Sequence, residues 1–200
     1  MTQSKPIPSV NFKGKWSLDR YHHAIETGEI TDWNVELLGG ELFEMSPEGP
    51  LHSGKIGSVG RYLQTIIPIS QAWLRFGNPV TLSHSEPEPD IAIVRPDPDE
   101  YWNRHPGLDD ILLIIEFSDS SLSKDKDPQG IKYTTYAKEG VPDYWIVDLK
   151  NQLLQVNRQP QGAQYLSRNE FYKAIVKPLL LDISIDVDRL LRGQQNPAIS

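Results

Sequence analysis

The run Ile111-Leu112-Leu113-Ile114-Ile115-Glu116-Phe117-Ser118 is the strongest indication of the fold of this chain. Five consecutive branched apolar residues are typical of a strand that is covered by helices on both faces. Glu116 follows them directly, and it needs a partner, a metal ion or an exposed edge, because burying a lone carboxylate is costly. A second apolar run, residues 91–94, comes directly after Pro89-Asp90. We therefore predict two strands that each carry an acid at one end.

Helical and strand-like patterns alternate along the rest of the chain. Ser17 is a suitable helix N-cap, Gly39-Gly40 is a hairpin dipeptide, and Gly140 is a suitable helix end. Because helices precede and interrupt strands, we expect an α/β or α+β fold with a mixed β-sheet flanked by helices. Helices are predicted at residues 18–26, 52–67 and 127–138, and strands at residues 33–38, 41–45, 72–76, 80–82, 90–94, 111–117, 144–149, 153–157, 164–167 and 172–176.

Length and composition favour one soluble domain. Two hundred residues usually form a single domain, which we place at residues 16–192, between a flexible arm at 1–15 and a tail at 193–200. The chain has no cysteine, which excludes disulfides and thiolate catalysis. Its first residues resemble neither a signal peptide nor an anchor, and its apolar runs are too short to span a bilayer. We expect a cytoplasmic protein without a membrane partner.

The charge of the chain weakens any nucleic-acid interpretation. Its 20 Lys and Arg residues and 27 Asp and Glu residues give a net charge of −7. Contacts from Lys and Arg to phosphates supply most of the non-specific affinity for nucleic acids. A metal-dependent nuclease is a partial exception, because divalent ions neutralise the acids that line its site. The charge therefore lowers the expectation of DNA binding without excluding it.

Asp90 and Glu116 are the first candidates for a metal site. They stand 116 − 90 = 26 residues apart, at the start and at the end of predicted strands, so neighbouring strands would bring them together. Mg²⁺ takes oxygen ligands, with one or two carboxylates plus substrate phosphate. Lys132 lies early in the next predicted helix, with Tyr136 four residues on along the same face. Its charge can orient a water or stabilise a developing phosphorane.

Two simpler interpretations stay open at this stage. Glu116 and Lys132 would also suit a structural ion pair between a strand end and a helix. His22 and Glu26 are four residues apart, with His23 adjacent, and could form a metal pair. A solvated helix face is the preferred interpretation there, because no third ligand with suitable spacing is evident.

A longer ordered set of residues resembles the Uma2-type endonucleases (DUF820). That family belongs to the restriction-endonuclease-like superfamily, which a PD-(D/E)XK signature defines. The resemblance covers roughly residues 18–156, and the whole ordered set is more specific than any one piece of it. The matching pieces are Gly40-Glu41-Leu42-Phe43-Glu44-Met45-Ser46-Pro47, His52, Pro89-Asp90, Ile114-Ile115-Glu116-Phe117-Ser118, Asp127, Lys132, Tyr136-Ala137, Gly140-Val141 and Tyr144-Trp145-Ile146-Val147-Asp148.

The resemblance implies a restriction-endonuclease-like core with its active acids on adjacent central strands. Asp90 and Glu116 then correspond to the metal-binding acids. The superfamily usually places its lysine two residues after the second acid, where this chain has Ser118. Families of this type can supply the lysine from the following helix instead, which would make it Lys132.

The same resemblance assigns auxiliary roles to two upstream residues. Glu41 matches an acid that such folds place near the metal ion, and His52 opens the helix that follows. A turn or cap role is the alternative for each of them. Asp148, at the end of a predicted strand, is expected to be structural.

The expected function is hydrolysis of phosphodiester bonds in nucleic acid, with DNA the preferred substrate, by a Mg²⁺- or Mn²⁺-dependent endonuclease. A homodimer is expected because cutting a duplex needs two sites. One alternative is a catalytically inactive dimeric binding or scaffold protein that retains the nuclease fold. Another is a phosphodiesterase that acts on RNA or on a nucleotide.

Overall fold

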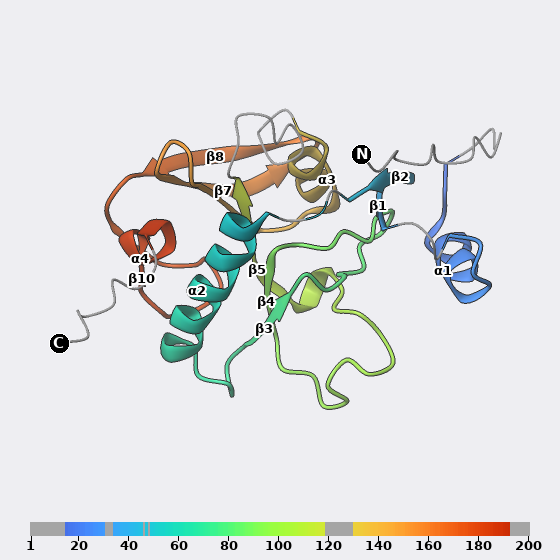
Figure 1. Ribbon diagram of the computed structural model, residues 1–200, viewed down its shortest axis with the longest axis horizontal. Helices are drawn as coiled ribbons and strands as arrows, with labels where there is room; N and C mark the ends of the chain where they lie inside the picture. Colours follow the sequence, from blue (N-terminus) through green and yellow to red (C-terminus); the bar gives the residue numbers. More distant parts are fainter. Residues whose placement is uncertain (1–14, 31–33, 46, 48, 119–129, 193–200) are drawn as a thin grey trace.

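A computed structural model of the chain describes residues 15–30, 34–45, 47, 49–118 and 130–192 (Figure 1). The predicted arm apart from Lys15, the predicted tail and the predicted helix start at residues 127–129 lie outside these ranges. The helices are α1 (Leu18–Glu26), α2 (Pro50–Ile66), α3 (Ile131–Glu139) and α4 (Val187–Arg192), with a 3-10 helix, η1 (Leu108–Asp110). The strands are β1 (Val35–Leu38), β2 (Glu41–Glu44), β3 (Trp73–Phe76), β4 (Ile91–Val94), β5 (Ile111–Ser118), β6 (Asp143–Asp148), β7 (Leu153–Gln161), β8 (Gln164–Phe171), β9 (Ile175–Val176) and β10 (Ile185–Asp186).

Six strands form the central sheet, in the order β3-β4-β5-β6-β7-β8 (Figure 1). Neighbouring strands are antiparallel except β5 and β6, which are parallel. A parallel neighbour requires a crossover connection, and α3 lies in the connection between these two strands. The result is a mixed sheet flanked by helices, which confirms the predicted fold class. No helix within the described ranges is long and apolar enough to cross a membrane.

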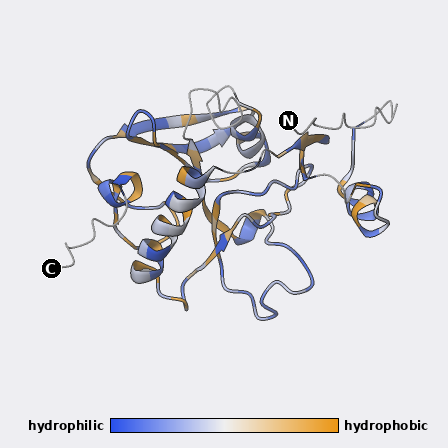
Figure 2. Cartoon of the chain, in the orientation of Figure 1, coloured by the Kyte–Doolittle hydropathy of each residue, from blue (hydrophilic) through white to orange (hydrophobic). Residues whose placement is uncertain are grey.

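β5 separates two apolar layers. Leu113 and Ile115 pack in the layer that contains residues of α2 and α4, whereas Ile114 packs in the layer that contains residues of α3. Successive side chains of a strand point to opposite faces, so a strand covered on both faces has to be apolar at every position. This is the physical reason for the uninterrupted run that the sequence shows. Figure 2 shows this concentration of hydrophobic residues in the central strands.

α1 and the β1–β2 hairpin share a separate apolar cluster beside the sheet (Figure 1). Tyr21 of α1 belongs to this cluster and donates from its hydroxyl to the carbonyl of Val35, at 2.9 Å. Leu37 of β1 forms an isolated antiparallel bridge with Glu86. Through this bridge, β1 lies beside the segment that leads into Asp90 and β4.

The predicted strand at residues 80–82 is wrong. Thr81 forms only an isolated bridge with Gly107. The amide of Leu82 donates to the carbonyl of Ser85 at 2.9 Å, so a local turn uses a donor that a sheet ladder would need. Apolar residues at both ends of this short run produced a strand-like pattern, although their neighbours form a loop.

β7 and β8 are longer than the sequence predicts. They form a hairpin around Gly162, which has a φ of 58°. Pairing continues as far as Gln161 opposite Gln164, through residues that are mostly polar and exposed. β8 is an edge strand of the sheet, and the residues added to the predicted strands, 158–161 in β7 and 168–171 in β8, are mostly polar and not buried. The hydrophobic pattern therefore marks only part of each strand, namely the start of β7 and the hairpin end of β8.

Leu113 allows a direct test of the central position of β5. This side chain is fully buried, so Leu113→Ala removes apolar contacts and leaves a cavity. The free energy of unfolding should fall by roughly 2–5 kcal/mol, as measured by urea denaturation. Leu166→Ala deletes the same atoms from β8, where the side chain is 67% exposed, and should change the free energy by less than about 0.5 kcal/mol. Equal losses in the two variants would contradict this arrangement.

Candidate functional site

Asp90 and Glu116 lie across from each other at one end of the β4–β5 ladder. The antiparallel register pairs Ile91 with Ile115, so the next position outward places Asp90 opposite Glu116. Directly opposed residues lie side by side on an antiparallel pair. Asp90 Oδ2 also accepts a hydrogen bond from the Phe117 amide at 2.6 Å, which fixes its carboxylate against β5. The structure therefore brings together the two acids that the sequence singled out.

Glu116 is fully buried, and α3 supplies donors to it. Glu116 Oε1 accepts from Lys132 Nζ at 3.2 Å and from the Tyr136 hydroxyl at 3.1 Å. Lys132 and Tyr136 are four residues apart on one helix face, so both can reach one carboxylate oxygen. Burial raises the pKa of Tyr136 well above its usual value, with Glu116 as the next cause, so its hydroxyl stays a donor.

Lys132 uses all of its donors inside the protein. Besides Glu116, its amine lies 3.1 Å from Glu36 Oε2 and donates to the carbonyl of Glu88 at 3.0 Å. An ammonium has three donors, and three oxygens surround this one. Burial alone would lower the pKa of Lys132, but Glu116 first and Glu36 second outweigh it and raise the pKa above its usual value. The amine is therefore a permanent cation at neutral pH.

His52 reaches the same site from α2. Its Nε2 lies 3.1 Å from Asp90 Oδ1, and its ring meets Phe117 edge-on at a centroid distance of 6.2 Å. The imidazole is buried with the carboxylate. His52 therefore lies beside the site, as the resemblance implied, and contacts Asp90.

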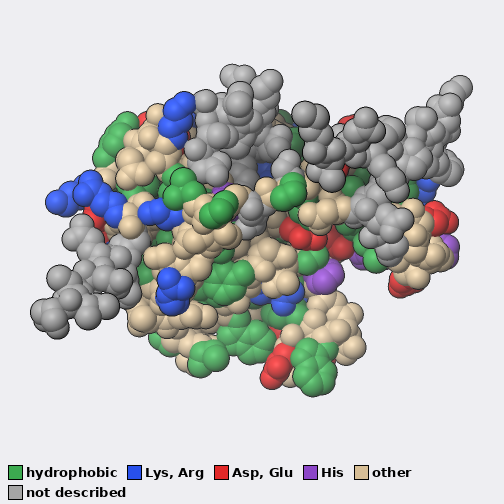
Figure 3. All heavy atoms as spheres, in the orientation of Figure 1, with side chains coloured by type: hydrophobic (Ala, Val, Ile, Leu, Met, Phe, Trp, Pro, Cys, Tyr) green, Lys and Arg blue, Asp and Glu red, His purple; other side chains and the backbone are tan. Residues whose placement is uncertain are grey.

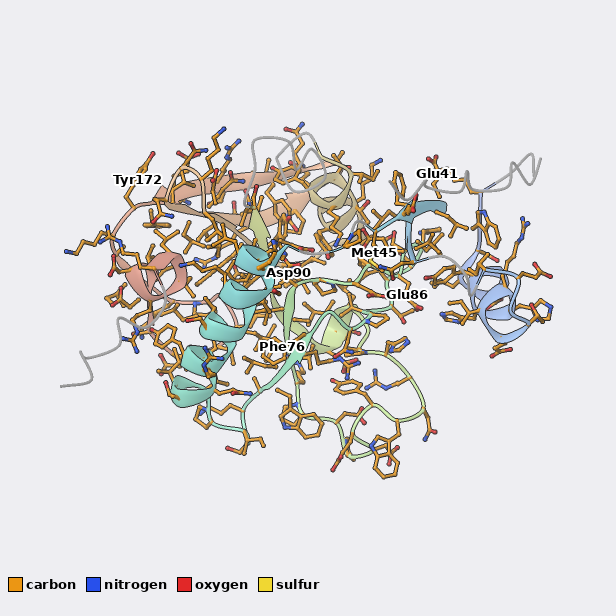
Figure 4. The ribbon with its side chains drawn as sticks, in the orientation of Figure 1. Glu41, Met45, Phe76, Glu86, Asp90 and Tyr172 are labelled. Carbon is orange, nitrogen blue, oxygen red and sulfur yellow. The ribbon has the colours of Figure 1, made fainter. Side chains whose placement is uncertain are left out.

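Glu41 does not lie in this cluster, and Glu36 takes the place expected for it. Glu41 is exposed on β2, and Figure 4 shows it on the hairpin, well away from Asp90. Glu36 is buried on β1, where all four residues are buried. The signal for Glu36 was present in the sequence, because Val35-Glu36-Leu37-Leu38 places an acid inside an apolar strand, as happens at Glu116. The resemblance directed attention to the wrong strand of the hairpin.

Among the residues that the structure describes, the cluster contains more carboxylates than ammonium groups. Three buried carboxylates, Glu36, Asp90 and Glu116, lie around the ammonium of Lys132. Burial raises the pKa of Glu36, and Glu116 raises it further, although Lys132 opposes both effects. Burial also raises the pKa of Glu88, with Glu36 as the next cause. An additional cation near these acids would therefore be electrostatically favourable.

The donor chemistry suits a hard divalent cation. Within the described ranges, no group of three or more His, Asp and Glu residues could hold a metal ion. The pair of Asp90 and Glu116 offers only oxygen, which is the ligand type that Mg²⁺ prefers, and Mg²⁺ commonly takes one or two carboxylates and fills its other positions with water and phosphate. These two residues fit a site of that kind.

Two other polar residues have structural contacts. Asp148 accepts from the backbone amide of Asn151 at 2.8 Å and from its side chain at 2.7 Å, so it stabilises the turn after β6. His22 Nε2 lies 2.9 Å from Glu86 Oε2, so His22 faces Glu86, while Glu26 is exposed. Neither contact joins the Asp90 cluster.

Comparison with known proteins gives a consistent result. The profile of the Uma2 family, described as "Putative restriction endonuclease", matches residues 18–188. Among solved structures, the fold is similar to a chain from Anabaena variabilis described as "a putative nuclease belonging to DUF820". That match has a TM-score of 0.62 and 18% sequence identity, and it covers 80% of this chain and 91% of that chain. No curated protein matches this sequence.

Glu36→Gln tests the raised pKa of Glu36. A carboxyl whose folded-state pKa exceeds its ordinary value of 4.5 stabilises the fold below that pH, and the contribution is lost as the pH rises through the raised pKa. The free energy of unfolding of the wild type minus that of Glu36→Gln should therefore fall as the pH rises above the ordinary value of 4.5. Glu44→Gln, at an exposed position of β2, is the matched control and should leave this difference constant. A constant difference for Glu36→Gln as well would contradict the assignment.

Lys132→Gln tests the cation of the cluster. The variant leaves Glu36 and Glu116 without their buried partner, so the free energy of unfolding at neutral pH should fall by roughly 3–5 kcal/mol. Because protons can neutralise the carboxylates, the deficit should shrink as the pH is lowered. Lys150→Gln, at an exposed turn, should cost less than about 0.5 kcal/mol in the same urea titrations. A deficit that is independent of pH would show that Lys132 contributes through packing alone.

Proposed function

The chain belongs to the Uma2 family, as its ordered motifs predicted, and we propose that it is a Mg²⁺- or Mn²⁺-dependent endonuclease that hydrolyses phosphodiester bonds in DNA. Membership of this family supports a nuclease, while the metal ion and the DNA substrate are the proposal. The observation that supports it best is the cross-strand position of Asp90 and Glu116, with Lys132 bonded to Glu116.

In this proposal, Asp90 and Glu116 hold the metal ion. When bound, the ion would supply charge that polarises the scissile phosphate and lowers the pKa of a nearby water. The protein would hold its two carboxylates in place before the ion arrives. Asp90 is fixed by the Phe117 amide and by His52, and Glu116 is fixed by α3. Fixed ligands reduce the reorganisation that binding and reaction require.

Lys132 acts in this proposal as a positioning residue for Glu116. A lysine that takes a proton from water must be neutral, and the raised pKa of Lys132 keeps it charged. A lysine that contacts the phosphate must have a donor available, and its three donors contact Glu36, Glu116 and the Glu88 carbonyl. Its contribution is therefore to orient Glu116 and to offset the charge of the acids.

In the hydrolysis itself, a water oxygen would bond to phosphorus while the bond from phosphorus to the leaving deoxyribose oxygen breaks, and the leaving oxygen would take a proton from solvent water. The proton released by the water needs an acceptor. His52 and Asp90 form a hydrogen-bonded pair at the site, and a neutral imidazole can accept a proton. We assign His52 the auxiliary role of orienting Asp90 and receiving that proton.

The acidic composition constrains how DNA would bind. Figure 3 shows Lys and Arg side chains scattered over the displayed face, without a continuous basic surface. Phosphate contacts supply most of the non-specific affinity for nucleic acids, so binding to DNA should be modest without a divalent ion. The homodimer and the cytoplasmic location that we expected from the sequence stay predictions, as does the domain division at residues 16 and 192.

Cleavage by the carboxylate variants is the decisive test. Asp90→Asn and Glu116→Gln keep the shape of each side chain but remove charge from the proposed metal ligands. We expect Mg²⁺- or Mn²⁺-dependent cleavage of plasmid and oligonucleotide DNA to fall by about 10²-fold or more in each variant. The measurement is product formation on gels over time, with EDTA as the metal-free reference.

Asp182→Asn is the control for these variants, because Asp182 is an exposed carboxylate paired with Lys177. It should cleave at the wild-type rate. Undiminished cleavage by Asp90→Asn would reject the proposed site. If the wild type cleaves neither DNA nor RNA with either ion, the scaffold interpretation replaces the enzyme.

A further inference from the structure

A groove runs along α2 and ends at Asp90. Its volume is about 410 Å³. One wall is a face of α2, and the opposite wall is the end of β3 with the turn that follows it. Figure 4 shows Phe76 and Asp90 on the α2 side of the sheet. The lining residues are Ser53, Ile56, Gly57, Gly60, Arg61, Gln64, Phe76, Gly77 and Asp90.

The wall of the groove that α2 forms extends over several turns of the helix. Ser53, Gly57, Gly60 and Gln64 recur at intervals of three and four residues, so they lie on one face of the helix. At a rise of 1.5 Å per residue, the distance from Ser53 to Gln64 is about 16 Å. The groove is therefore elongated, with the proposed catalytic acid at one end.

Arg61 supplies positive charge to this groove. It is exposed, and within the described ranges no ion pair involves its guanidinium. A Cβ atom at Gly57 would lie 3.6 Å from Arg61 Nη1, so the guanidinium lies over the glycine and along the groove wall. In a chain of net charge −7, an arginine without an acidic partner beside an open groove can bind a phosphate.

Phe76 supplies an aromatic surface on the opposite wall. Its ring packs against the backbone of Gly60, where a Cβ atom would lie only 2.5 Å from Phe76 Cε1. The side chain is nevertheless 37% exposed. An exposed aromatic ring held against a helix can stack on a nucleobase, and this contact is tolerant of sequence because every base has a π-face.

We propose that the groove binds one unpaired strand of DNA, with a phosphate on Arg61 and a base stacked on Phe76. The inference rests on the proposed function, because it places the strand so that it leads to Asp90. Stacking on Phe76 requires a base that is free of its partner. Duplex binding depends on many phosphate contacts, and this groove offers one arginine. The enzyme should therefore prefer single-stranded DNA, or the unpaired parts of a frayed duplex, to a fully paired duplex.

Equilibrium binding tests this inference separately from cleavage. The full chain in EDTA is titrated against a fluorescein-labelled oligonucleotide, single-stranded or annealed to its complement, and anisotropy gives Kd at several salt concentrations. We expect the single strand to bind about tenfold more tightly than the duplex. Arg61→Gln should weaken single-strand binding about tenfold and reduce the slope of log K against log salt by about 0.7.

Phe76→Leu keeps an apolar side chain against Gly60 but removes the ring. It should weaken single-strand binding by about 5- to 100-fold and leave the salt slope unchanged. Arg168→Gln, on β8 and outside the groove, loses the same charge and should behave as the wild type. Thermal unfolding by circular dichroism checks that every variant folds. If Phe76→Leu does not fold, Arg61→Gln, at an exposed position, tests the inference by itself.

Equal affinity for single strand and duplex would overturn the inference, as would equal effects of Arg61→Gln and Arg168→Gln. If these results occur while Asp90→Asn abolishes cleavage, only the groove assignment fails. If the groove variants weaken single-strand binding but no divalent ion supports cleavage, the strand-binding groove stands and the proposed nuclease function fails.

Discussion

The ammonium of Lys132 connects parts of the chain that are distant in sequence. Its donors reach Glu36 on β1, Glu116 on β5 and the Glu88 carbonyl ahead of β4. An unpaired charge in this position would be strongly destabilising, so the cation and the oxygens around it depend on each other. β1 lies outside the central sheet, and its position beside the site depends on this contact together with the bridge from Leu37 to Glu86.

The site uses the end of the sheet, where both faces are within reach. α3 covers one face and supplies the donors to Glu116, while α2 covers the other face and supplies His52. Asp90 stands directly before β4, so its carboxylate can reach both α2 and the Phe117 amide. The faces themselves are filled by apolar side chains. In the proposed function, a divalent ion would offset the charge of the buried acids at the end of the sheet, and the exposed Arg61 on α2 would contact a phosphate.

Local chemistry was sufficient to predict many of the elements. α1 has the predicted bounds, because Ser17 caps it by accepting from the Arg20 amide. β5 was recognisable because burial on both faces leaves a continuous apolar run. The hydrophobic pattern predicted a strand at residues 80–82, where a local turn uses the hydrogen bonds instead. It also predicted β7 and β8 too short, because the residues that it missed are mostly polar. In the site, strand ends and helix spacing singled out Asp90, Glu116 and Lys132, and the family resemblance singled out His52, whereas Glu36 was missed in favour of Glu41.

Periodicity, caps and turn residues act between near neighbours, so the sequence alone was enough to indicate the mixed sheet, its central strand and the acids at the strand ends. The choice of Glu36 over Glu41 depends on which strand of a hairpin docks against the core, and both strands carry acids. The use of all three ammonium donors of Lys132 depends on contacts such as the one to the Glu88 carbonyl, which lies 44 residues away in sequence. The groove along α2 depends on how a helix and a turn pack together. Sequence spacing specifies which residues share a face, but only the packing of separate elements specifies what that face meets.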